Sequence, residues 1–386
     1  MSTSKLFNPL PFGTGVLQHK IVLSPMTRIR ADDHGVPLPY VKTYYAQRAC
    51  VRGTLLITEA VAVCPRAKGL PNIPGIWSDS QIAAWKDVVD EVHSMGCSIW
   101  IQLWATGRAS EMETLSSLGF ELESSSDVPI ASGDPVPRPL SSEDIQLYIR
   151  EYAQAARNAV HGAGFDGVEI HGAHGYQVDQ FLQSSCNRRT DKWGGSIPGR
   201  SKFGLDITQS IIDAVGKDRV GMKLSPWSTF QGMGTMVDLL PQFQHFITCL
   251  REMDIAYLHL TNSRWLQEEQ PGVKIHPDVN NATFVRMWGL EKPIVLAGGY
   301  DADSAKRLVD ETYSEHNNVL VAFGRHYISN PDLPFRLKMG IALQKHNRDT
   351  VYIPFSEEGY IDYPFCDEYL NQRQGGGHGY MRLDAN

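Results

Sequence analysis

Residues 54–61, which read Thr54-Leu55-Leu56-Ile57-Thr58-Glu59-Ala60-Val61, form a short and mostly apolar run that follows a glycine. Runs of this kind, rather than runs that alternate apolar and polar residues, are typical of strands buried on both faces of a parallel sheet. The chain contains seven more of them, bounded by Gly or Pro: residues 21–26, 98–104, 167–173, 220–226, 256–261, 293–299 and 318–324. The sequence therefore predicts eight buried, parallel strands.

Helical patterns lie between these strands. The clearest occupies residues 141–163, where Ser141 can cap the first turn and the acidic Glu143 and Asp144 suit the positive end of a helix. Its apolar side chains and alanines recur at helical spacing: Ile145, Tyr148, Tyr152, Ala155, Ala156 and Val160. Similar patterns occupy residues 80–95, 200–215, 237–253, 302–313 and 333–345.

Alternating strands and helices without a break in composition predict one α/β domain, a (β/α)8 TIM barrel over residues 1–370, because eight parallel strands can close and leave no edge. Long loops follow the third and fourth strands, at residues 105–139 and 174–199, where barrels typically carry lids or binding loops. Residues 371–386 include three consecutive glycines and are expected to form a flexible tail. An open doubly wound sheet is the alternative, but it would need a GxGxxG turn where the first strand ends in Ser24-Pro25-Met26-Thr27.

Composition narrows the class of protein. The 386 residues include 34 Gly and 22 Pro, far fewer than in a low-complexity chain, so a folded protein is expected. A net charge of -7 without a Lys/Arg run argues against nucleic acid as a partner. The six cysteines lie far apart and are expected to be reduced thiols, and no apolar stretch approaches the roughly 18 residues of a membrane helix. We expect a cytoplasmic protein that acts on a small molecule as a monomer or homodimer.

The carboxyl ends of barrel strands meet at one pocket, so the residues there are the candidates for chemistry. The predicted strands bring to it Pro25, Met26, Thr27, Glu59, Ala60, Gln102, Trp104, His171, His174, Tyr176, Lys223, Gly298, Gly299, Gly324 and Arg325. The glycines and Arg325 follow the last two strands, where barrels often bind a phosphate through backbone N–H groups and an arginine fork. Tight strand-to-helix turns are an equally simple explanation for the glycines.

Residues 169–176 form the densest polar cluster. Two imidazoles and a phenol, His171, His174 and Tyr176, can donate hydrogen bonds to a developing oxyanion and supply a proton. A metal-dependent hydrolase with Glu169 joining the two histidines as ligands is one alternative, although no other strand end brings a comparable ligand. A barrel that only binds a phosphate-bearing molecule is another.

Several of these residues lie in motifs that occur together in one family. The motifs are Ser24-Pro25-Met26-Thr27-Arg28, Gln102-Leu103-Trp104, Gly167-Val168-Glu169-Ile170-His171-Gly172-Ala173-His174-Gly175-Tyr176, Arg189-Thr190-Asp191-Lys192-Trp193-Gly194-Gly195-Ser196, Leu224-Ser225-Pro226 and Phe323-Gly324-Arg325. In this order, from about Leu6 to Tyr369, they resemble the old yellow enzyme family of FMN-dependent ene-reductases. Residues 102–109 and 257–265 are similar to those of fungal members in ergot-alkaloid pathways that act on chanoclavine-I aldehyde.

The resemblance implies a cofactor, a reaction and residue roles. It implies that FMN lies across the barrel mouth, surrounded by Pro25, Met26, Thr27, Ala60, Gln102, His171 and Lys223, with its phosphate on Gly298, Gly299, Gly324 and Arg325. His171 and His174 would bind the carbonyl oxygen of an α,β-unsaturated aldehyde or ketone, Trp104 would shape the pocket, and Tyr176 would protonate the α-carbon. NADPH would reduce the flavin first in the same pocket, which implies ping-pong kinetics and explains why no second nucleotide fold is needed.

Some positions depart from the pattern of many relatives. His174 stands where Asn is common, Lys223 where Arg is common, Pro198-Gly199 where Glu-Asn is common, and Trp193 where Tyr is common. A flavin-dependent isomerase that removes and returns a hydride is a related alternative. Tyr176 favours net reduction, because reduction needs a proton donor there and a Phe would favour isomerisation.

Overall fold

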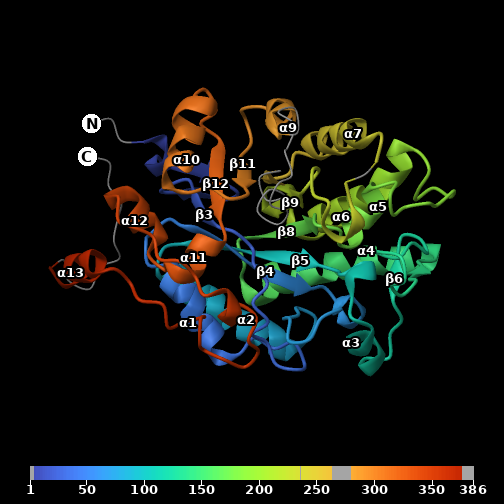
Figure 1. The fold of residues 1–386 in the computed structure, drawn as a ribbon, viewed down its shortest axis with the longest axis horizontal. Coiled ribbons are helices and arrows are strands. Elements are labelled where there is room, and N and C mark those ends of the chain that lie inside the picture. Colours follow the sequence, from blue (N-terminus) through green and yellow to red (C-terminus); the bar gives the residue numbers. More distant parts are fainter. Residues whose placement is uncertain (1–3, 235, 263–279, 376–386) are drawn as a thin grey trace.

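The computed structural model describes residues 4–234, 236–262 and 280–375. Eight parallel strands form a closed barrel whose order around the wall follows the chain. They are β3 (Ile21–Leu23), β4 (Leu55–Ala62), β5 (Ser98–Trp104), β8 (Gly167–Gly172), β9 (Val220–Leu224), β10 (Tyr257–Thr261), β11 (Ile294–Ala297) and β12 (Val319–Phe323). Each strand begins at the first or second residue of a predicted run. The predicted barrel is therefore confirmed. Figure 1 shows the strands crossing the middle of the molecule, with helices around them.

The helices that cover the wall largely match the predicted patterns. They are α2 (Asp79–Ser94), α4 (Ser142–Arg157), α6 (Ile197–Val215), α7 (Leu239–Glu252) and α10 (Ala302–Arg307). Ser141 caps α4 as expected: its side chain accepts a hydrogen bond from the N–H of Asp144, whose side chain accepts from the N–H of Ser141. Two further helices, α1 (Pro39–Arg48) and α9 (Ala282–Trp288), were not predicted.

The helix predicted for residues 333–345 is wrong over its second half. The observed helix α12 spans Leu333–Met339 and ends because Gly340 adopts a left-handed conformation, with φ of 70°. The boundary expected at residue 370 is crossed by helix α13 (Asp367–Gly375), and the remainder of the expected tail, residues 376–386, lies outside the described residues. Among the residues that are described, no helix is both long and apolar enough to cross a membrane.

A small antiparallel hairpin closes the amino end of the barrel. It consists of β1 (Leu10–Phe12) and β2 (Gly15–Leu17). The ring of Phe12 packs on Trp100 and Tyr257, with ring centroids 5.3 and 5.0 Å apart, near the starts of β5 and β10. Aromatic side chains therefore fill the amino end of the barrel, and a binding site is expected at its carboxyl end.

Both long loops carry structure of their own. The loop after β5 contains η3 (Gly107–Ala109), α3 (Met112–Ser117), β6 (Glu123–Ser124) and β7 (Arg138–Pro139), and the loop after β8 contains α5 (Gln177–Leu182). The unusual Pro198-Gly199 lies in the first turn of α6, a position that tolerates proline. A Cβ atom at Gly199 would lie 2.2 Å from the carbonyl oxygen of Gly194, so the turn accepts only glycine there.

Buried arginines fasten a late segment, residues 347–361, to the rim of the barrel; we call it the C-terminal strap. Arg28 Nη2 donates to the carbonyl of Gly359 at 2.6 Å, and Arg30 Nε donates to the carbonyl of Ser356 at 2.7 Å. The guanidinium of Arg28 also lies 4.9 Å from the ring centroid of Tyr360. Since Arg28 and Arg30 are each at most 1% exposed, these carbonyls depend on them for partners.

Replacing Arg28 with methionine is expected to lower the free energy of unfolding by about 2–4 kcal/mol, because the buried carbonyls of Val351 and Gly359 lose a charged donor while much of the side-chain volume remains. Urea denaturation followed by circular dichroism measures the change. The exposed Arg52 offers a matched control, Arg52→Met, for which a change below about 0.5 kcal/mol is expected. Equal stabilities of the two variants would show that the strap is not held by Arg28.

Candidate functional site

Four aromatic side chains from the ends of β5 and β8 meet at the carboxyl end of the barrel. The Trp104 ring stacks on His171 with centroids 6.0 Å apart, and the edge of Tyr176 meets Trp104 at 4.6 Å and His171 at 5.0 Å. The ring of His174 lies 5.8 Å from that of His171. The structure thus brings together the four residues expected to bind the substrate and supply the proton.

The loop after β8 turns sharply, and this turn places Tyr176 over His171. His174 and Gly175 both adopt left-handed backbone conformations, with φ of 56° and 73°. Such a conformation is uncommon for a residue with a Cβ atom, and two side chains stabilise it here. Ser225 Oγ accepts a hydrogen bond from the N–H of His174 at 2.7 Å, and Asp179 Oδ2 accepts from the N–H of Gly175 at 2.9 Å.

The two histidines are neutral at physiological pH. Burial, followed by the charge of Lys223, holds the pKa of His171 and of His174 well below the usual value. The N–H of Ala173 donates to His171 Nδ1 at 3.4 Å, so the neutral ring of His171 carries its proton on Nε2. Burial also raises the pKa of Tyr176 to about 12, so its hydroxyl stays protonated. The cluster therefore offers N–H and O–H donors without a net charge.

A half-buried shelf adjoins the cluster at the end of β3. Its residues Pro25, Met26 and Thr27 are partly exposed, whereas the flanking Ser24 and Arg28 are buried. A bulge in β4 between Ile57 and Ala60 shifts the register, so that Ala60 pairs with Gln102 of β5. These residues come from the three neighbouring strands β3, β4 and β5 and are among those expected to contact a flavin ring.

A buried carboxylate organises the polar interior below this shelf. Glu169 Oε1 accepts from Gln102 Nε2 at 2.7 Å, and Glu169 Oε2 accepts from the hydroxyl of Tyr257 at 2.9 Å and from His259 Nδ1 at 2.8 Å. Burial alone would raise the pKa of Glu169, but His259, Lys223 and Tyr257 outweigh it and lower the pKa. Glu169 is therefore ionised, and both of its oxygens are engaged in hydrogen bonds.

These contacts count against the metal-site alternative. Glu169 faces Gln102, Tyr257 and His259 rather than a site shared with His171 and His174. In residues 4–234, 236–262 and 280–375, no three His, Cys, Asp or Glu side chains are arranged to hold a metal ion.

Lys223 is a buried, positively charged residue in the polar interior around Glu169. It pairs in register with His171 of β8 and with His259 of β10. Burial lowers the pKa of Lys223 to about 8, although the charge of Glu169 opposes the change. An ammonium group therefore lies at the barrel mouth at neutral pH, where it can face an anionic ring.

The loops after β11 and β12 carry the residues that are expected to bind a phosphate. Gly298 and Gly299 have φ of 120° and 72°, so the turn itself requires glycine at both positions. Gly324 is different: its φ of −95° suits any residue, but a Cβ atom there would lie 3.2 Å from the sulfur of Met26. A side chain at Gly324 would therefore press on Met26 of the shelf, and the next residue, Arg325, begins helix α11 (Arg325–Ser329). Glycines at the ends of β11 and β12 suit a phosphate held by backbone N–H groups.

Residues outside the recognised motifs also reach the cluster. Tyr352 of the C-terminal strap lies close enough to raise the pKa of Tyr176, and the side chain of Gln231, from η6 (Phe230–Gly232) after β9, opposes that rise. Neither was predicted, because both follow the catalytic motif by a long stretch of chain and lie in irregular loops.

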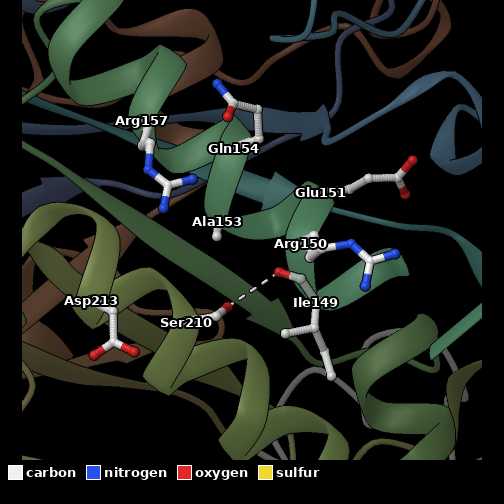
Figure 2. A pocket seen from close by; sticks show the side chains of 8 residues that line it. All are labelled: Ile149, Arg150, Glu151, Ala153, Gln154, Arg157, Ser210 and Asp213. Atoms are coloured by element: carbon white, nitrogen blue, oxygen red, sulfur yellow. Dashed lines mark hydrogen bonds between the residues drawn. The ribbon is translucent and has the colours of Figure 1, made fainter. Parts of the chain in front are cut away.

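A large surface hollow lies elsewhere on the molecule. Figure 2 shows it between α4 and α6, with a volume of about 570 Å³ and lining residues that include Arg150, Arg157 and Asp213. A hydrogen bond from Ser210 Oγ to the carbonyl of Ile149 spans it at 3.2 Å. It contains none of the strand-end residues, so it is not a candidate for the chemistry.

The chain is similar to known flavin enzymes along most of its length. The model of the NADH:flavin oxidoreductase / NADH oxidase family matches residues 5–344. A protein of Claviceps purpurea (strain 20.1) named "Probable inactive dehydrogenase easA" is 74% identical over 372 residues, which are 96% of this chain and 98% of the relative. The chanoclavine-I aldehyde reductase ifgG of Penicillium roqueforti (strain FM164) is 56% identical over 365 residues, 95% of this chain and 96% of the relative.

Solved structures agree with these sequence matches. The crystal structure of Old Yellow Enzyme from Pichia sp. AKU4542 superposes with a TM-score of 0.87 at 32% identity, covering 94% of each chain. The old yellow enzyme homologue from Zymomonas mobilis superposes with a TM-score of 0.83, also at 32% identity, covering 94% of this chain and 99% of that one.

Proposed function

The chain belongs to the NADH:flavin oxidoreductase / NADH oxidase family of FMN-dependent oxidoreductases, and from that premise we propose that it is an NADPH-dependent ene-reductase. Its substrates are α,β-unsaturated aldehydes and ketones, whose conjugated C=C bond it reduces. One observation carries this proposal: a protonated tyrosine lies against a neutral histidine N–H donor and a tryptophan ring at the open end of a flavoprotein barrel.

The residues present fit FMN. Its ring would rest on the shelf of Pro25, Met26 and Thr27 beside Ala60, Gln102, His171 and Lys223, and its phosphate would lie on Gly298, Gly299, Gly324 and Arg325. When bound, FMN supplies the hydride for the β-carbon after taking it from the nicotinamide. Lys223 would stabilise negative charge on the ring, and Thr27 would donate a hydrogen bond to a ring carbonyl.

The protein side chains bind and polarise the substrate. His171 and His174 donate N–H hydrogen bonds to its carbonyl oxygen, which withdraws charge from the double bond and makes the β-carbon electrophilic. Trp104 forms one wall of the pocket. Tyr176 transfers its hydroxyl proton to the α-carbon, so that one hydride and one proton complete the reduction.

The names of the relatives point in two directions, one to an inactive dehydrogenase and one to an aldehyde reductase. In this chain His171, His174 and Tyr176 are all present and in contact, which supports the aldehyde-reductase assignment. The same tyrosine favours reduction over the isomerase alternative, in which no external proton donor is needed.

An anaerobic spectral titration tests the proposal. The purified protein is expected to be yellow, to lose its flavin band on addition of NADPH and to regain it on addition of a conjugated aldehyde. Product analysis for the saturated aldehyde separates reduction from isomerisation, and NADH in place of NADPH compares the two reductants. Full activity after chelation excludes the metal-dependent alternative. A protein that purifies without flavin, or whose reduced flavin no enal reoxidises, would contradict the proposal.

The pH dependence of flavin reduction tests the role of Lys223. Because the pKa of Lys223 is lowered to about 8, its positive charge is lost as the pH rises through that value, and the rate of flavin reduction by NADPH is expected to fall there. In the Lys223→Arg variant the guanidinium stays charged, so the rate is expected to remain level to about pH 10. Stopped-flow measurements from pH 6.5 to 10 record both profiles. An unchanged decline in the variant would assign it to another group.

A further inference from the structure

Gln231 lies beside Tyr176 in a backbone conformation that costs the fold stability. Its φ of 56° and ψ of 37° are left-handed, which is unfavourable for a residue with a Cβ atom. The next residue, Gly232, is also left-handed, with φ of 73°. Because glycine would adopt this conformation at lower cost, the glutamine side chain is a candidate for a functional role.

The turn that contains Gln231 packs directly on the backbone before Tyr176. A Cβ atom at Gly175 would lie 2.8 Å from Gln231 Cβ and 3.1 Å from the carbonyl oxygen of Phe230. Gln231 Oε1 is buried and has no hydrogen-bond partner in the part of the chain that is described. The amide side chain also moderates the rise in the pKa of Tyr176 that burial causes. Its amide is therefore a polar neighbour of the phenol.

Arg108 holds the backbone of Gln231 in place. Its Nη2 donates to the carbonyl of Gln231 at 2.9 Å, and its Nη1 donates to the carbonyls of Val128 and Pro129 at 3.0 and 3.1 Å. Arg108 is 4% exposed, so these are buried, charge-assisted hydrogen bonds.

Gln180 connects Arg108 to the loop that carries Tyr176. Its Oε1 accepts from the N–H of Arg108 at 3.2 Å, and its Nε2 donates to the carbonyl of Gly175 at 2.7 Å. Arg108 and Gln180 therefore connect the loops after β5, β8 and β9 into one closed network. These hydrogen bonds tie the loop that carries Tyr176 to the turn that carries Gln231.

We propose that Gln231 is a positioning residue for the proton donor, and that Arg108 braces it. The proposal rests on the ene-reductase function proposed above. Tyr176 gives the proton of its hydroxyl to the α-carbon and is left as a phenolate, which later regains a proton from solvent. The Nε2–H group of Gln231 donates a hydrogen bond to that developing anion and keeps the hydroxyl aimed into the pocket.

The test uses Gln231→Gly in the FMN-bound protein, because glycine removes the amide and accepts the left-handed backbone, so the variant folds. Its thermal midpoint is expected to equal or exceed that of the native protein. Flavin reduction by NADPH is expected to stay within twofold of native, whereas reoxidation by a conjugated aldehyde slows about tenfold or more. Gln209→Gly on the exposed face of α6 is a matched control for the loss of a glutamine, and is expected to leave both half-reactions unchanged.

A second variant in the Tyr176→Phe background separates positioning from general disturbance. If Gln231 acts through the tyrosine hydroxyl, Gln231→Gly causes no further slowing once that hydroxyl is absent. An equal, additional slowing in this background, or native reoxidation in the single variant, would overturn the proposal.

A readout without turnover keeps this inference apart from the proposed function. In protein labelled with ¹³C at the tyrosine Cζ atoms, the Tyr176 signal is the one missing from Tyr176→Phe. Gln231→Gly is expected to shift that signal and Gln209→Gly is not. Failure of the native protein to reduce any enal would refute the ene-reductase function, whereas an unmoved Tyr176 signal would refute the role of Gln231 whatever the reaction.

Discussion

The Tyr176→Phe variant is expected to reduce conjugated aldehydes about 10²–10⁴-fold more slowly than the native protein, because general acid catalysis contributes a factor of that size. Phenylalanine keeps the ring that packs on Trp104 and His171 and removes only the hydroxyl group that carries the proton. Flavin reduction by NADPH needs no proton from this residue and is expected to be unchanged. Anaerobic stopped-flow absorbance measures the two half-reactions separately.

A second tyrosine provides a matched control for the loss of the hydroxyl group. Tyr313→Phe removes a hydroxyl from a tyrosine at the end of η7 (Leu308–Thr312), away from the pocket, and is expected to have no effect on either half-reaction. An equal loss of both half-reactions in Tyr176→Phe would indicate damage to flavin binding and would remove Tyr176 from the role of proton donor. Isomerised rather than reduced product from this variant would indicate that the hydroxyl decides between the two reactions.

His171→Leu is expected to slow enal reduction about 10²–10³-fold, which is the usual effect of losing one hydrogen-bond donor to a developing oxyanion. The proton on Nε2 of the neutral ring is the donor that is lost, since Nδ1 accepts from the N–H of Ala173. Binding of a conjugated aldehyde to the oxidised protein is expected to weaken as well, because its carbonyl oxygen uses the same donor.

The pH dependence of His171 follows from its environment. Its pKa is held well below the usual value by burial and by Lys223, so binding of a conjugated aldehyde to the native protein is expected to show no histidine transition between pH 6 and 8. His161→Leu, at an exposed position in η4 (Asn158–Ala163), which directly follows α4, is the matched control. An equal loss of activity in His171→Leu and His161→Leu would indicate that the substitutions lower the stability of the protein, rather than that His171 binds the carbonyl oxygen.

The strands of this protein were predictable because a closed parallel barrel buries both faces of each strand. Every residue of β4 and of β9 is buried, and continuous apolar runs follow directly. The hairpin of β1 and β2 escaped prediction because its strands have three residues each and Pro11 interrupts the pattern. Helix α12 was predicted too long because Gly340 ends it while the apolar spacing continues into residues 341–343.

The residues of the candidate site likewise differ in how well the sequence predicts their positions. Residues such as Gln102, His171 and Lys223 lie on strands, so the geometry of a parallel barrel is enough to place them at one end. Gln231 and Tyr352 reach Tyr176 from irregular loops whose positions depend on hydrogen bonds between distant segments. No spacing rule within one sequence reports such contacts.

The C-terminal strap has a consequence for the synthesis of the protein. Arg28 and its partner Gly359 are separated by 331 residues, so the guanidinium group has no strap carbonyl to bind until residue 359 has left the ribosome. A nascent chain that ends before the strap therefore leaves Arg28 and Arg30 without these partners, and incompletely folded chains expose apolar surface on which chaperones and proteases act. The rim of the barrel can thus be completed only after residues 347–361 have been synthesised.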